Sequence, residues 1–96
     1  MADIVVVEKD MAYNRRDLIA GLHRAFGDVV EPDGQSFKIP VGSGALSVEL
    51  GVEAVRRIAL IEVVHMPVTL TFTGLNETQR AETLKRFDRA FQRGGG

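Results

Sequence analysis

The sequence contains two histidines, His23 and His65, and their imidazole side chains are the groups best suited to bind a metal ion. A metal site needs such side chains close together with a carboxylate, but no HExxH or comparable spacing joins these two. The chain contains no cysteine, which excludes disulfides and every metal or cluster site built on thiolates. We therefore predict no metal and no cofactor, and we keep His65 only as a group that titrates near an interface.

Two short polar segments could bind ions. Asp28, Glu31 and Asp33 supply carboxylate oxygens before Gly34, and hard cations prefer oxygen ligands. Their spacing is not that of an EF-hand loop, and the Pro-Asp-Gly sequence in this segment is typical of a β-turn. Residues 42–44 (Gly-Ser-Gly) could suggest a phosphate loop or a nucleophile elbow, but both of those precede a helix, whereas strand-like alternation follows here. We therefore predict hairpin turns at both segments.

Basic side chains gather in the last part of the chain, where they could meet phosphate groups or an acidic partner. Glu82 lies on the same side of the predicted helix, and no aromatic residue interleaves on that side for base stacking, so a solvated helix face is the favoured interpretation. The whole chain has twelve basic and thirteen acidic residues, and its net charge of −1 argues against nucleic-acid binding. Asp88, on the same helix, is predicted to form a structural ion pair. The basic patch consists of Lys85, Arg86, Arg89 and Arg93.

The sequence shows no nucleophile–base pair, metal-ligand set or cofactor motif, so we predict a protein that is not an enzyme. Its 96 residues predict a single domain (1–96), and 45% hydrophobic and 26% charged residues are typical of globular proteins. No apolar run approaches the roughly 18 residues of a membrane span, and the N-terminal residues lack the pattern of a signal peptide. We expect a cytoplasmic protein of bacterial type with no membrane association, and a flexible glycine tail at 94–96.

Two segments have the pattern of amphipathic helices. Apolar residues recur every four positions over residues 15–26, after a good N-cap at Asn14 and before a terminating Gly27. The second helix begins after Asn76, and Gln79 completes a capping box with it. The apolar faces comprise Leu18, Leu22 and Phe26 in the first helix, and Ala81, Leu84, Phe87 and Phe91 in the second.

The remaining segments have strand patterns. Residues 4–7 form a β-branched run, and residues 37–52 alternate between apolar and polar on either side of the Gly-Ser-Gly loop. Residues 29–31 are expected to pair with residues 35–37 across the Pro-Asp-Gly turn.

The segment 57–73 is predicted to be extended and to form a hairpin with the strand before it. Its second half alternates strictly, whereas its first half is apolar on both faces. Pro67 cannot donate a hydrogen bond to a sheet, so we predict an irregularity near residues 62–67 that shifts the register. A helix over residues 52–63 is the competing interpretation, because Val52, Val55 and Ala59 also fit helical spacing.

These elements predict an α+β two-layer sandwich with an antiparallel sheet of four to five strands, two helices on one face, and the order β-α-β-β-β-β-α. The other face of the sheet would then be uncovered. An uncovered apolar strip on a small protein usually meets a partner, so we predict an interaction module that forms a homodimer or binds an unknown protein. The expected interface consists of Ala59, Ile61, Val63 and His65.

The alternative is a protein that binds a small apolar ligand between the sheet and the helices. An empty cavity costs about 24 cal/mol per Å³, so a ligand-sized pocket would use up most of the stability of so short a chain. The side chains that would wall the pocket are therefore better explained as core. They are Phe37, Leu50, Phe72, Phe87 and Phe91.

Overall fold

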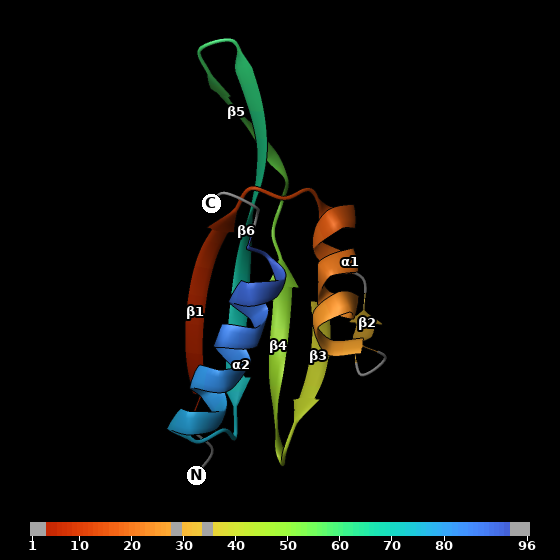
Figure 1. Ribbon diagram of the computed structural model, residues 1–96, viewed down its shortest axis with the longest axis vertical. Coiled ribbons are helices and arrows are strands. Elements are labelled where there is room, and N and C mark those ends of the chain that lie inside the picture. Colours follow the sequence, from red (N-terminus) through yellow and green to blue (C-terminus); the bar gives the residue numbers. More distant parts are fainter. Residues whose placement is uncertain (1–3, 28–29, 34–35, 93–96) are drawn as a thin grey trace.

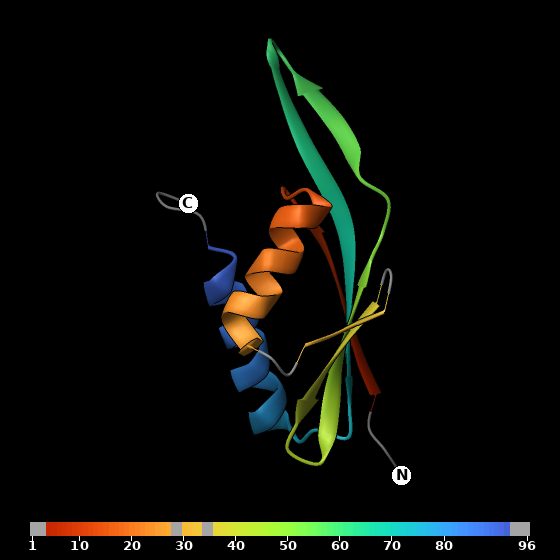
Figure 2. The same cartoon turned by 90° about the vertical axis from the view of Figure 1, so that its right-hand side faces the viewer.

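The computed structural model describes residues 4–27, 30–33 and 36–92, which form a sheet with two helices on one face and a hairpin that projects beyond them (Figures 1 and 2). The main sheet is antiparallel with the strand order β1-β6-β4-β3-β2, and β5 pairs only with β6. The predicted α+β two-layer sandwich is thereby confirmed. The elements are β1 (Ile4–Met11), α1 (Arg15–Phe26), β2 (Glu31–Asp33), β3 (Ser36–Val41), β4 (Gly44–Leu50), β5 (Ala54–Ile58), β6 (Ile61–Thr73) and α2 (Glu77–Ala90).

Both helices begin at the caps that the sequence predicts. The Asn14 side chain accepts a hydrogen bond from the Asp17 backbone N–H at 2.8 Å, and Gly27 ends α1 with a positive φ of 67°. Asn76 and Gln79 form the reciprocal capping box of α2, with bonds of 2.8 and 3.0 Å. The apolar face of α2 differs in one position from the prediction, because Ala81 is exposed. Its fully buried positions are Thr83 and Phe87, which lie four residues apart on one side of the helix.

The core fills the space between the helices and one face of the sheet. Its strand residues come from alternate positions of β3, β4 and β6, with partly buried residues of β1 packed against them, as the period of two in a strand requires. The largest fully buried side chains are Phe37, Phe72, Phe87, Leu18, Leu22, Ile39, Leu46, Met66, Leu70, Val48 and Val68.

Strand β6 is the longest element of the sheet and runs past the end of its neighbours. β1 pairs with it from Ile4↔Thr73 to Met11↔Met66, and β4 pairs with it on the other side as far as Leu50↔Val68. The outer part of β6 pairs only with β5, which makes a two-stranded hairpin. The competing helix over residues 52–63 is therefore wrong.

The predicted irregularity that shifts the register near residues 62–67 is confirmed at residues 66–67, and the structure places its extra residue in the opposite chain segment. Between the pairs Leu50↔Val68 and Ala54↔His65, the three residues 51–53 stand opposite the two residues 66–67. The Pro67 carbonyl accepts a bond from the Gly51 N–H at 2.8 Å, but Pro67 has no N–H to return one. The ladder is interrupted at that point, and the partner segment accommodates the extra residue there.

The second hairpin also differs from its prediction. β2 begins at residue 31 and pairs with β3 from Glu31↔Lys38 to Asp33↔Ser36, so the strand includes Pro32. A proline is tolerated there because β2 is the edge strand of the sheet, where one side of the backbone needs no partner. The expected partner residue 29 and the turn at 34–35 lie outside the described residues.

The projecting hairpin makes the molecule elongated. Residues 52–65, which we call the arm, continue the long axis of the sheet beyond both helices (Figure 2). The principal extents are 49 × 29 × 24 Å, and the radius of gyration is 14.0 Å. A compact chain of this length would have a radius of gyration of about 12–13 Å. Among the described residues, neither helix has the length and apolar character that a membrane span requires.

Candidate interaction surface

The arm is exposed over most of its length, and only residues 63–65 at its base are half-buried. Every residue from Val52 to Glu62 is exposed, although five of them are large and apolar. Leu60 at the tip is fully accessible to solvent. The exposed apolar side chains of the arm are Val52, Val55, Ile58, Leu60 and Ile61.

The two faces of the arm have different composition. Directly paired residues of antiparallel strands project to the same side of the sheet. The pairs Arg56↔Val63 and Ile58↔Ile61 therefore lie on one face of the arm, and this face continues the helix-free side of the main sheet. We call this continuous helix-free side of body and arm the open face. The opposite side of the arm carries the pairs Val55↔Val64 and Arg57↔Glu62, the latter an ion pair of 2.6 Å.

The turn at the tip of the arm is strained. Ile58 pairs with Ile61, which leaves Ala59 and Leu60 as a two-residue loop. Ala59 has a positive φ of 54°, at the first position of a loop where glycine is the favoured residue. Ala59 therefore lies in the turn and not on the strand face where the sequence analysis placed it. The other three predicted interface residues, Ile61, Val63 and His65, do lie together on the open face of β6.

Polar contacts hold the base of the arm to the body. The Asp10 carboxylate on β1 lies 2.9 Å from His65 Nδ1 and 3.4 Å from the Arg56 guanidinium. On the other side, the Glu53 carboxylate accepts the backbone N–H of Arg15 at the N-terminus of α1, where the helix dipole favours an anion. Both contacts fix the direction in which the arm projects.

The open face continues from the arm onto the body of the protein. The floor of this part consists of small or short side chains on β4 and β6, and two large apolar side chains of β1 stand beside them. Ile4 is 64% exposed and Val6 is 55% exposed. The floor residues are Ala45, Ser47, Thr69, Thr71 and Thr73.

The structure does not bring the predicted ion-binding candidates together. His23 is exposed in the last turn of α1, whereas His65 lies at the base of the arm and contacts Asp10. Within residues 4–27, 30–33 and 36–92, no group of three or more histidines and carboxylates is placed to hold a metal ion. Asp28 and the side chains of Glu31 and Asp33 lie outside the described part of the chain. The Gly-Ser-Gly segment joins β3 to β4 as the predicted hairpin loop.

The predicted basic patch is divided between two kinds of environment. Arg86 donates to the Ala25 carbonyl at 2.8 Å and stacks over Phe26, so it joins α2 to the end of α1. Lys85 and Arg89 are exposed, and Arg93 lies outside the described residues. The predicted ion pair of Asp88 forms with Lys9 of β1, at 3.0 Å.

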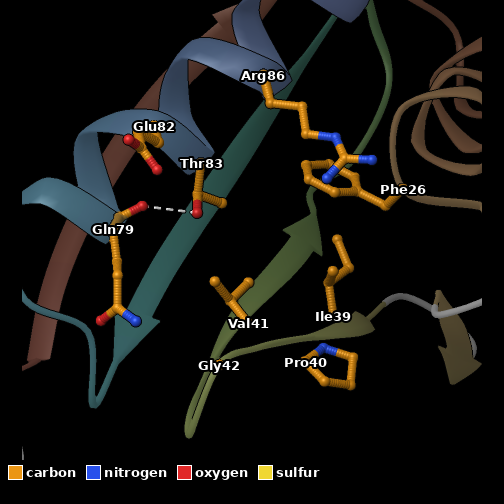
Figure 3. Close-up of a pocket in the computed structure, with 9 residues that line it drawn as sticks. All are labelled: Phe26, Ile39, Pro40, Val41, Gly42, Gln79, Glu82, Thr83 and Arg86. Atoms are coloured by element: carbon orange, nitrogen blue, oxygen red, sulfur yellow. Dashed lines mark hydrogen bonds between the residues drawn. The ribbon is translucent and has the colours of Figure 1, made fainter.

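A groove of about 550 Å³ lies between α2 and the β3–β4 hairpin (Figure 3). It is open to solvent, and Arg86 stacked on Phe26 forms one end while Gln79 approaches Gly42 at the other. The Thr83 hydroxyl in its wall already donates to the Gln79 carbonyl at 2.7 Å. The five side chains expected to wall an apolar ligand pocket are all buried members of the core instead.

Comparisons of the chain with protein-family models, with curated proteins and with solved structures gave no match. The candidate site is therefore defined by geometry, and its main feature is the arm. Sequence reasoning missed the body part of this surface, Ile4 and Val6. A comparison of segment lengths could have indicated the arm. The β-branched run at the N-terminus is much shorter than the extended segment 57–73, so the N-terminal strand could pair with only part of that segment.

Proposed function

We propose that this protein is a non-enzymatic interaction module that self-associates through the open face of the arm. The observation that carries the proposal is the exposure of the apolar arm side chains in a hairpin held to the body only at its base. An isolated two-stranded hairpin is at best marginally stable in water. Exposed apolar area gains about 25 cal/mol per Å² when it is buried, so a partner would stabilise the arm as well as bind to it.

The arm also has unpaired backbone groups along its edges. Among the described residues, no strand pairs with the outer edge of β5, and β1 ends before the outer part of β6. Natural proteins usually cover or charge such edges. A partner that covers this hairpin would bury apolar side chains and limit edge pairing at the same time.

A second copy of the chain suits this role, because each copy also carries exposed apolar side chains on its body. Ile4 and Val6 are exposed on the same open face, beside the end of β6 that lies opposite to the arm. A symmetric dimer would cover both apolar regions of each copy through one repeated contact.

Analytical ultracentrifugation of two matched variants tests the proposal. Ile61 is 65% exposed on the open face, and Val55 is 63% exposed on the other side of the arm. Ile61→Glu should dissociate a wild-type dimer into chains of 10.5 kDa, whereas Val55→Glu should leave the dimer intact. Equal effects of the two variants would contradict the assignment of the open face, and a monomeric wild-type protein would contradict self-association itself.

A further inference from the structure

The open face has a symmetric order of side chains about Pro67. Paired residues of neighbouring strands form rows across this face, two residues apart along β6. The row next to Pro67 on the body side carries Glu8 and Glu49, and the row next to it on the arm side carries His65. Farther out in both directions the rows combine large apolar side chains of β1 and of the arm with small or polar side chains of β4 and β6 and with Arg56. These outer rows contain Val6, Thr71 and Ser47, then Ile4, Thr73 and Ala45 on the body, and Val63 with Arg56, then Ile61 with Ile58 on the arm.

We infer that the arm of one copy binds the open face of the body of a second copy, about a two-fold axis that crosses β6 over Pro67. This inference rests on the proposed self-association and names the receiving surface. The axis lies between the two stacked sheets and runs perpendicular to β6. Rotation about it reverses the direction of β6, so a row of one copy lies over the row of the second copy that is equally distant from Pro67 on the other side. Ile61 of each copy then lies over Thr73 of the other.

The shapes of the two surfaces fit this arrangement. In this arrangement β5 of one copy lies over β4 of the second copy, so Ile58 lies over Ala45 of the second copy. Large side chains of the arm thus pack on the small floor residues of the body. Ile4 of the second copy borders that floor. On the side of β1, Val6 of the second copy approaches a hollow of about 110 Å³, whose lining includes Val63 and His65.

The charges fit as well. Arg56 stands over Ser47 of the second copy, one row from Glu49 on the same strand. Its guanidinium contacts Asp10 of its own copy at 3.4 Å, and a side chain of this length also reaches Glu49. His65 lies over the row of the second copy that contains Glu8 and Glu49. Asp10, in the Pro67 row, lies over Asp10 of the second copy, and each of these carboxylates contacts Arg56 and His65 of its own copy, which offsets the like charge. The remaining charge of this face is Lys38 on β3, next to Ser47.

Charge reversal tests the contact between Arg56 and Glu49. Arg56→Glu should raise the dissociation constant of the dimer by about tenfold or more, because both symmetric contacts become repulsive. Glu49→Arg should do the same, and the double variant should return the constant to near the wild-type value. Arg57→Glu is the matched control, since the neighbouring arginine lies on the other side of the arm, and it should leave the constant unchanged.

A distance measurement tests the position of the axis. The chain has no cysteine, so Leu60→Cys provides a single site for a nitroxide spin label at the tip of the arm. The tips lie seven residues from Pro67 in each copy, which predicts a separation of about 45 Å at about 3.3 Å per residue. Pairing of the two arms along their edges would instead give a separation below about 25 Å.

The outcomes separate this inference from the function on which it rests. A wild-type monomer overturns both. If the wild-type protein is a dimer with a short distance between the arm tips, only the arm-on-body arrangement is overturned. The same holds if the dimer of the double variant has a dissociation constant no lower than those of the single variants. A dimer with the long distance and with charge rescue supports both.

Discussion

The body and the arm of this protein use the same kinds of side chain for opposite purposes. Leu22 in the body has no accessible surface, whereas Leu60 in the arm is fully accessible, and both are leucines of one short chain. The body closes its core with two helices over one face of the sheet, while no helix of the described part of the chain covers either face of the arm (Figure 1). The difference shows that apolar residues in the body encode folding, and we propose that those in the arm encode association.

The largest expected effect comes from comparing these two leucines. Leu22→Ala leaves a cavity in the core and should lower the free energy of unfolding by about 2–5 kcal/mol. Leu60→Ala removes no contact in the monomer and should change it by less than about 0.5 kcal/mol. Urea denaturation monitored by circular dichroism, at a concentration below dimer formation, measures both. Similar losses would mean that the arm is packed in the isolated chain.

An intermediate effect is expected at the junction of the two regions. A Cβ at Gly51 would lie 2.4 Å from Cγ of Pro67, so Gly51→Ala must push the two segments apart. We expect a loss of about 1–3 kcal/mol in unfolding free energy and a weaker dimer, because the arm leaves the body at this point. Thermal denaturation and sedimentation report the two effects. A stable variant with unchanged association would show that Gly51 does not set the direction of the arm.

A smaller loss of stability than at Gly51 is expected for the contacts at the base of the arm. Asp10→Ala removes the contacts with His65 and Arg56, which are partly exposed and worth about 1 kcal/mol or less. Amide hydrogen exchange should nevertheless become faster over residues 54–65 and remain unchanged in β3 and β4. Faster exchange throughout the sheet would indicate that Asp10 supports the body rather than the arm.

Local signals in the sequence predict the body well. The caps at Asn14 and Asn76 fix where both helices begin, and the alternation in residues 68–73 shows which side chains of β6 face the core. Asn14 and Asn76 bond within three residues of themselves, so no knowledge of the sheet order is needed to predict the caps.

The arm could not be predicted in the same way, because its exposure depends on where other strands end. Ile61 and Val63 are exposed or half-buried because β1 ends at Met11 and because they lie on the open face, which neither α1 nor α2 covers. Their apolar pattern is equally typical of a buried strand or a helix. The position of the extra residue was also non-local, since Pro67 lies in one strand and the accommodating segment 51–53 in another.

Sedimentation velocity of the wild-type protein, from low to high micromolar concentration, tests the central claim most directly. We predict that the mass rises from 10.5 kDa toward twice that value as the concentration increases, and that Ile61→Glu stays at 10.5 kDa throughout. A wild-type mass that remains at 10.5 kDa over the whole range would contradict the account of the arm as a surface for self-association.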